Sequence, residues 1–273
     1  MRSVGLGLDT SSEVIATALV TVERGETVAA RLLEAPRGAA RETLNEVGKL
    51  LRDAGVGLEE VAFFAVGIGP GSYMGVRVGI ATALGVALGR GIPALGVPSL
   101  EAAALEAPPE AGWILATEVA GRDREALYGQ LFRRVKAGGG RDLEAASGAQ
   151  RLVRSQVVEF LRHAGRCAVF GEKEPKGPDD SGGGARVRKR DAEGVPGVHR
   201  VWVTGPGRDR VMDPPVARGL IAREGVTGPN LAECVACLGR LRWKEGLGGQ
   251  TLALVPLYLR PPTASAPTAG RTS

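Results

Sequence analysis

The sequence predicts an α/β protein, on three observations. Runs of β-branched and apolar residues alternate with segments of helical periodicity, the first runs are joined by short turns, and a glycine-rich turn links a buried strand to a helix. The predicted order over about the first hundred residues is strand, strand, strand, helix, strand, helix, strand. A plain Rossmann chain would alternate strictly from its start, so we expect a different sheet.

The chain opens with an antiparallel meander of three strands. Residues 4–8 and 14–22 are β-rich runs, and the polar residues 9–12 between them form a turn. A second turn at 24–26 leads into a third strand at 27–33. The short turns leave no room for a helical crossover, so neighbouring strands must run in opposite directions.

An amphipathic helix follows the meander. Across residues 41–54 the apolar side chains Leu44, Val47 and Leu51 recur at helical spacing, and Gly55 supplies the expected stop. This pattern predicts a helix with one apolar face.

A buried strand, a glycine-rich turn and a second helix come next. Residues 61–66 are continuously apolar, and the turn at 69–72 precedes a helix expected at 73–89. A short strand at 94–97 then completes the first unit. Ser99 is expected to cap a third helix that ends before Pro108.

A second unit follows. We expect strands at 113–117, 126–135, 167–170 and 198–203, helices at 156–163 (capped by Ser155) and 230–244, and an extended segment at 252–259. The predicted domains are residues 1–107 and 108–228, with 229–260 packing back near the first. Glycine, proline and charge predict a flexible insertion at 171–197, and residues 261–273 a disordered tail.

Composition narrows the class of protein. With 273 residues, of which 44% are hydrophobic, the chain can bury a core without disulfides or structural metals. The most apolar window, 78–89, is shorter than the ~20 residues of a membrane-spanning helix. Three cysteines and an N-terminus without a secretory apolar stretch predict a cytoplasmic protein.

The basic charge balance does not by itself predict nucleic-acid binding. The net charge is +5 and the pI is about 9.4, but the basic cluster at 186–190 accounts for most of the excess. Aromatic residues are only 4% of the chain and do not interleave with basic ones. We therefore do not expect direct, sequence-specific contact with RNA or DNA.

The turn at 69–72 is a candidate anion site because it precedes a helix N-terminus, where free N–H groups favour negative charge. The spacing is neither a dinucleotide fingerprint nor a P-loop, so a tight turn built on glycine is the alternative. Asp9 ends the first strand, and we favour a solvated turn residue there over a group that holds a hydrated metal or orients a phosphate. The candidate residues for an anion or nucleotide are Asp9, Thr10, Gly69, Gly71, Ser72 and Arg77.

The second helix carries a face almost without side chains. Gly75, Gly79 and Ala83 fall four residues apart, and each glycine costs roughly 0.8 to 1 kcal/mol against alanine, so an offsetting contact is expected. The neighbour is either the chain's own sheet or a second molecule. If it is a second molecule, Gly79→Leu leaves a soluble monomer that does not pair.

The other reactive side chains give little support for a catalytic or metal site. Cys234 and Cys237 form a C-x-x-C pair in a helical stretch, which favours buried structural thiols over zinc or redox function. His163 and His199 are too far apart for a helical metal pair, and there is no G-x-S-x-G nucleophile elbow. We predict no catalytic residues and no metal site.

Several segments together resemble the TsaB (YeaZ) family of tRNA threonylcarbamoyladenosine biosynthesis proteins. They are VGLGLDTSS at 4–12, APRG at 35–38, VGIGPGSYMGVRVGI at 66–80, GIPALGVPSL at 91–100 and PLYLR at 256–260. The chain departs from the family pattern at 39–42, at 117–128 and in the 171–197 insertion, which concerns the second lobe more than the first two helices.

The resemblance implies an actin-like ATPase (ASKHA) fold with two ribonuclease-H-like lobes. It implies a non-catalytic partner of TsaD, the transferase that forms N6-threonylcarbamoyladenosine (t6A) at position 37 of tRNAs reading ANN codons. It further implies that the ATPase TsaE joins the complex, that the chain alone forms a homodimer, and that contact with tRNA is indirect. No cofactor of its own is implied, and a nucleotide at the TsaD interface is left open.

In the family the contact with TsaD uses the first two helices. Carried onto this sequence, the interface residues are Leu44, Val47, Leu51, Tyr73, Gly75, Val76, Gly79, Ile80 and Ala83. The alternative function is a small phosphotransferase of the same fold, which would place Asp9 and the turn at 69–72 around ATP and Mg²⁺. The chain is short for such an enzyme.

Overall fold

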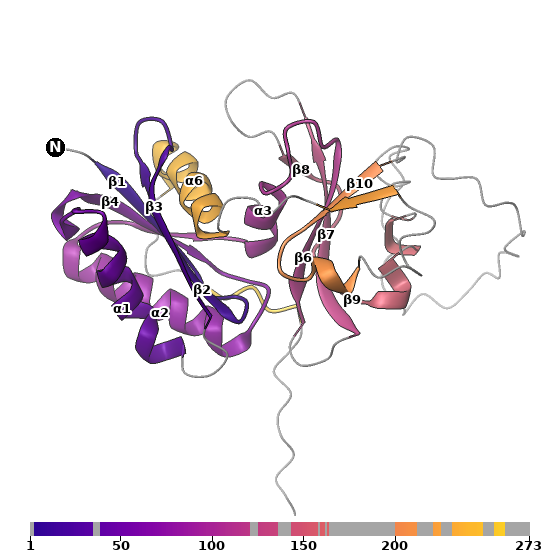
Figure 1. The fold of residues 1–273 in the computed structure, drawn as a ribbon, viewed down its shortest axis with the longest axis horizontal. Coiled ribbons are helices and arrows are strands. Elements are labelled where there is room, and N and C mark those ends of the chain that lie inside the picture. The colour runs from indigo at the N-terminus through magenta and orange to yellow at the C-terminus, as the bar shows by residue number, and fades with distance from the viewer. Residues whose placement is uncertain are drawn as a thin grey trace, which may run out of the picture.

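The computed structural model describes residues 3–34, 39–120, 125–135, 143–157, 159–161, 163, 200–211, 221–224, 231–247 and 254–259. They form two β-sheets with helices packed around them (Figure 1). No helix in these ranges is long and apolar enough to cross a membrane. The expected strand at 167–170, the insertion at 171–197 and the tail at 261–273 lie outside the described residues.

The strands and helices have the following bounds. The strands are β1 (Val4–Asp9), β2 (Val14–Thr21), β3 (Thr27–Glu34), β4 (Val61–Gly67), β5 (Ala94–Val97), β6 (Trp113–Val119), β7 (Ala126–Arg134), β8 (Leu143–Ala145), β9 (Gln150–Val153), β10 (Arg200–Thr204) and β11 (Ile221–Glu224). The helices are α1 (Ala39–Asp53), α2 (Tyr73–Arg90), α3 (Ser99–Ala104) and α6 (Leu231–Lys244), with short 3₁₀ turns at Leu58–Glu60, Arg154–Gln156 and Arg208–Arg210.

The first sheet has the strand order β3-β2-β1-β4-β5. The meander β1-β2-β3 is antiparallel, as the short turns predicted, and β4 and β5 join in parallel. Helices α1 and α2 cover one face, where their apolar side chains share a core with β1 and β4. Because the strand order is not that of a Rossmann sheet, the departure expected from the element order is confirmed.

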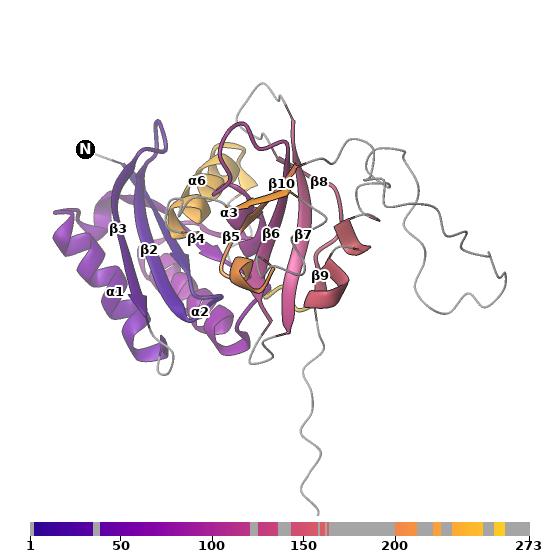
Figure 2. The same cartoon turned by 45° about the vertical axis from the view of Figure 1, so that its right-hand side comes forward.

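Helix α6 lies on the opposite face of this sheet. Two glycines allow the close approach: a Cβ on Gly7 would lie 2.2 Å from the carbonyl oxygen of Ala232, and a Cβ on Gly239 would lie 2.3 Å from the Ala65 side chain. Figures 1 and 2 show α6 and α3 between the two sheets. One apolar core runs through them, from Phe63 in the first sheet to Phe132 in the second.

The second sheet repeats the plan of the first. Its order is β11-β10-β6-β7-β8, so a central strand again has an antiparallel hairpin partner on one side and a parallel strand on the other. Strand β9 also pairs with β7. The sequence did not predict β8, β9 or β11, each of which is only three or four residues long.

Two predicted helix caps are wrong. Pro98 precedes α3 and Ser99 is its first residue; the Ser99 hydroxyl instead donates to Asp9. Ser155 lies inside a 3₁₀ turn that starts after Val153. The described residues between Val157 and His163 are helical. Ser99 has a tertiary partner, and the main chain beside Ser155 is held by the Arg154 N–H, which donates to the Glu125 carbonyl; local pattern shows neither contact. The extended segment expected at 252–259 is described from Leu254, and its Leu257 N–H donates to the Ile68 carbonyl.

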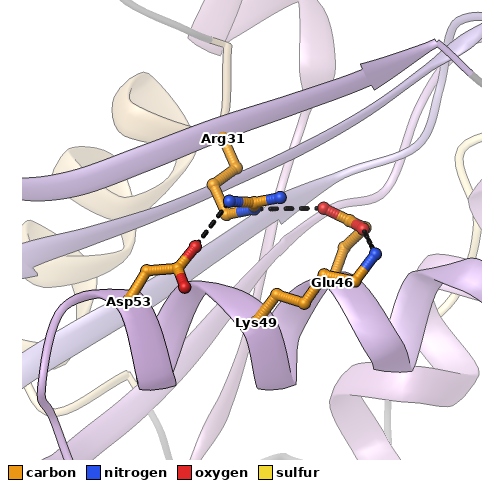
Figure 3. Close-up of polar contacts among 4 residues, drawn as sticks. All are labelled: Arg31, Glu46, Lys49 and Asp53. Atoms are coloured by element: carbon orange, nitrogen blue, oxygen red, sulfur yellow. Dashed lines mark hydrogen bonds and ion pairs between the residues drawn. The ribbon is translucent and has the colours of Figure 1, made fainter.

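An ion cluster fixes α1 to the edge strand β3 (Figure 3). Arg31 of β3 reaches Glu46 at 3.2 Å and Asp53 at 2.6 Å, and Lys49 also contacts Glu46 at 2.7 Å. Burial by itself would raise the pKa of Glu46, but Lys49 and Arg31 outweigh it and hold that pKa below its usual value. The cluster therefore sets where α1 lies against the sheet.

Candidate functional site

The two lobes meet at the carboxyl end of β1, where Asp9 is buried. In an open α/β sheet this end of the strands is where ligands usually bind. Asp9 has 1% exposure, so its interpretation as a solvated turn residue is wrong. The reason is tertiary: α3 from one side and β6 from the other close over it.

Three donors surround the Asp9 carboxylate. Oδ1 accepts from the Ser11 N–H at 2.8 Å and from Ser11 Oγ at 2.6 Å, while Oδ2 accepts from Ser99 Oγ at 2.9 Å. Burial raises the pKa of Asp9, and these hydrogen bonds to the charged form partly offset it. Gly67 lies so close to Oδ2 that a side chain there would displace the carboxylate.

Glu118 of β6 faces Asp9 from the second lobe. It is 1% exposed, its Oε1 accepts the N–H of Val119 at 2.7 Å, and its Oε2 lies 3.1 Å from Ser11 Oγ. Burial, with the charge of Asp9 second, raises the pKa of Glu118 to about 8. The sequence analysis did not identify Glu118, because a glutamate near a strand end usually faces solvent.

A third acid, Glu106, lies at the end of the α3 segment. Its Oε2 accepts the N–H of Gly205 at 3.0 Å, which joins the α3 segment to the loop after β10. Burial raises the pKa of Glu106 to about 7, and the charge of Arg208 opposes that change. Within the described ranges no group of three or more acidic, histidine or cysteine side chains is arranged to hold a metal ion.

The glycine-rich turn directs its polar groups into the chain. Gly69 N–H donates to Ser99 Oγ, Ser72 N–H donates to the Ser11 carbonyl, and Ser72 Oγ accepts from Gly75. Gly69 has φ +91°, which favours glycine, and a Cβ on Gly71 would lie 2.4 Å from Ser11 O. The alternative of a tight turn therefore describes this segment, and these groups are not free for an anion.

The remaining two candidates of that set also have internal partners. Thr10 Oγ1 donates to the Gly75 carbonyl at 2.7 Å. Arg77 lies over the ring of Tyr73, 3.9 Å from its centre, and its Nε donates to the Tyr258 hydroxyl at 2.7 Å. Tyr73 and Tyr258 stack with their rings 5.2 Å apart, so Arg77 belongs to an aromatic cluster at the start of α2 and not to the Asp9 site.

The small-residue face of α2 packs on the chain's own first lobe. A Cβ on Gly75 would lie 2.0 Å from the carbonyl oxygen of Thr10, and one on Gly79 would lie 2.4 Å from Thr10 Oγ1. Ala83 is fully buried. The expectation that this face meets a second molecule is therefore corrected, and so is the expected effect of Gly79→Leu, which would disturb the fold itself.

Helices α1 and α2 nevertheless expose apolar side chains. Of the predicted interface residues, Val47, Leu51, Val76 and Ile80 are buried in the core, whereas Leu44 is 57% and Tyr73 is 40% exposed. Met74, which the sequence analysis did not include, is 64% exposed. Of the predicted interface, Leu44 and Tyr73 are therefore accessible, and Met74 adds to the exposed apolar surface of α2.

The burial of the two α6 thiols favours a structural role for them. Cys234 is buried and Cys237 is half-buried, and both are free. Burial raises the pKa of each thiol, which disfavours the reactive thiolate.

Two sheets of the same strand order, with helices between them and an acidic residue at the end of each central strand, define an α/β protein of the actin-like ATPase (ASKHA) fold. The family model of TsaD, "tRNA N6-adenosine threonylcarbamoyltransferase", matches residues 34–157. YeaZ from Pseudomonas aeruginosa superimposes with a TM-score of 0.63 at 24% identity, over 94% of this chain and 100% of that one. This likeness shows the fold.

Curated relatives match a little over a third of the chain. TsaB of Haemophilus influenzae is 39% identical over 99 residues, which are 36% of this chain and 41% of that protein. TsaB of Escherichia coli is 38% identical over 95 residues, 35% of this chain and 40% of that protein. The matches span about two fifths of these relatives' length. These curated matches support the TsaB (YeaZ) family, and the resemblance predicted from the motifs is confirmed.

Proposed function

We propose that this chain takes part in t6A biosynthesis as a non-catalytic partner subunit of TsaD. In this role it binds TsaD through α1 and α2 and stabilises the working conformation of the transferase, while contact with tRNA at position 37 is indirect. TsaE joins the complex, and without TsaD the same helices pair two copies of the chain. The chain supplies no cofactor and no catalytic residue.

The observation that carries the proposal is the exposure of Leu44, Tyr73 and Met74 on helices whose opposite faces are already packed. Leu44 and Met74 keep more than half of their surface open to water. Burying a large apolar side chain contributes roughly 1.5–3 kcal/mol, so a partner that covers these residues gains binding energy without rearranging the core. Aromatic and methionine side chains are enriched at such interfaces.

The ion cluster also favours the exposed side of α1 and α2 as the surface that binds TsaD. Glu46, Lys49 and Asp53 of α1 are tied to Arg31, which holds the helix against β3 before any partner arrives. A helix that is fixed in advance loses little conformational entropy on binding.

The geometry at Asp9 weighs against the alternative of a phosphotransferase. Both carboxylate oxygens accept hydrogen bonds from within the chain, and the turn at 69–72 directs its donors inward. An ATP site with Mg²⁺ would have to break these bonds. Calorimetric titration with Mg·ATP separates the two functions: measurable binding by the chain alone would favour the phosphotransferase.

The decisive experiment mixes this chain with TsaD of the same organism and measures complex formation by size-exclusion chromatography with light scattering, followed by t6A formation on tRNA. We expect a mixed complex, and modification that needs both proteins. Leu44→Glu and Met74→Glu should abolish the complex while leaving the fold intact. Leu32→Glu is the matched control, because Leu32 is 64% exposed but lies on β3. If Leu32→Glu disrupts the complex and Leu44→Glu does not, the surface is misassigned.

A further inference from the structure

A single hydroxyl lies between two buried carboxyl groups where the lobes meet. Ser11 Oγ is 2.6 Å from Asp9 Oδ1 and 3.1 Å from Glu118 Oε2. A serine hydroxyl has one proton to donate, so it cannot donate to both carboxylates at once. If both acids were ionised, one of these short contacts would bring two lone pairs together in a site that is almost closed to water.

We propose that Asp9, Ser11 and Glu118 form a proton-dependent latch between the two lobes. In the closed latch a neutral Glu118 donates its Oε2 proton to Ser11 Oγ, and Ser11 Oγ donates its own proton to the Asp9 carboxylate. When Glu118 releases its proton to solvent, the Ser11 contact loses its donor, Asp9 and Glu118 repel each other, and the lobes separate at this point.

The assignment of the proton to Glu118 follows from the donors. Asp9 accepts three hydrogen bonds, from the Ser11 N–H, Ser11 Oγ and Ser99 Oγ, and donors of this kind stabilise a carboxylate. Glu118 accepts one main-chain N–H, on Oε1, which leaves Oε2 to carry the proton toward Ser11. The high pKa of Glu118 agrees with this assignment.

The surrounding charges favour a neutral Glu118 as well. From the first lobe it faces Asp9, and from the α3 segment it faces Glu106, and both raise its pKa. Arg208 acts on Glu106 and is not among the groups that shift Glu118. The latch is therefore closed at neutral pH and opens in mildly alkaline solution.

Amide hydrogen exchange at Ser11 and Val119 measures the opening, with rates corrected for the intrinsic effect of pH. In the wild-type chain we expect protection factors that are constant below about pH 4.5, fall toward tenfold per pH unit up to about pH 8 and then level off, because opening releases one proton between the open and closed pKa values of Glu118. Glu118→Gln is neutral at every pH, and its amide can donate to Ser11 and accept from Val119. Its protection should not change over the same range.

Ser99→Ala is the matched control. It removes a hydroxyl that donates to Asp9 but does not touch Glu118, so it should lower protection overall and keep the wild-type pH dependence. Equal pH dependence in Glu118→Gln and wild type would overturn the proposal.

A second measurement does not depend on any variant folding well. Carbon-13 NMR of the wild-type chain with labelled glutamate carboxyls should show two groups that titrate above pH 6, Glu106 and Glu118. Ionisation of every glutamate below pH 6 would overturn the latch.

Discussion

The two lobes share one strand plan but hold their central carboxyl groups in different ways. In the first lobe Asp9 ends β1, accepts three hydrogen bonds, and lies beside a turn against which α2 packs without a gap. In the second lobe Glu118 has one main-chain donor and depends on Ser11 of the first lobe for its other contact. The difference teaches that a repeated architecture can give one rigid half and one half that responds to its neighbour.

The largest effect should come from breaking the rigid half. Gly75→Ala places a methyl group 2.0 Å from the Thr10 carbonyl, where backbone must move, and we expect a loss of about 3 kcal/mol in the free energy of unfolding. Urea unfolding measures it. Gly85→Ala on the same helix has open space and should stabilise by up to about 1 kcal/mol. Equal effects at the two positions would show that α2 does not pack tightly on the first lobe.

Variants of the ion cluster test whether the contact of α1 with β3 stabilises the first lobe. Glu46 is 2% exposed and Glu46→Gln weakens its contacts with Arg31 and Lys49, so we expect a loss of about 1–2 kcal/mol. Because the folded pKa of Glu46 is lowered, its contribution is present above pH 4.5 and is lost as the pH falls further. Asp53→Asn, at an exposed site, should cost less than half as much. Thermal unfolding at pH 7 and pH 3 measures both.

The pH dependence of stability tests the acids at the junction between the two halves. The pKa values of Glu106 and Glu118 in the folded chain, about 7 and about 8, lie above the unfolded value of 4.5. The folded state therefore binds more protons, and stability falls as the pH rises from about 4.5 to 8.

Glu106→Gln isolates one of these two acids. It should reduce the slope of the unfolding free energy between pH 5 and 7 by roughly 1 kcal/mol per pH unit, which urea unfolding at several pH values measures. A slope that does not change would mean that Glu106 is already ionised.

The smallest effect should come from the aromatic cluster at the start of α2. Tyr258→Phe removes the hydroxyl that accepts from Arg77 Nε but keeps the ring that stacks on Tyr73, so we expect a loss of about 0.5 kcal/mol. Tyr258→Ala also removes the stacking and should cost more. If the two variants are alike in thermal unfolding, the ring contributes nothing to the first lobe.

The first lobe could be predicted largely from sequence because its elements are long and regular. The apolar periodicity of α1, the glycine-rich turn before α2 and the short turns between β1, β2 and β3 locate these elements to within one or two residues. In the second lobe β8, β9 and β11 are too short to show a period. The domain bounds at 1–107 and 108–228, with 229–260, stay predictions.

The junction between the lobes could not be predicted, because its partners are distant in the sequence. The hydroxyl of Ser99 and the carboxyl of Glu118 reach Asp9 and Ser11 across 90 and 107 positions. A pattern read along the chain shows a polar turn at 9–12 but not what covers it. For the same reason the spacing of Gly75, Gly79 and Ala83 predicted a close neighbour without showing that it is Thr10.

The contact of Arg31 with α1 also bears on how this chain avoids aggregation. β3 is the outer strand of the first sheet and has eight residues, so its free main-chain groups could template a strand of another molecule. The Arg31 side chain lies in this strand and is 36% exposed, and a charge on an edge strand disfavours the addition of another strand. By holding the Arg31 side chain against α1, Glu46 and Asp53 keep that charge in place on the edge strand.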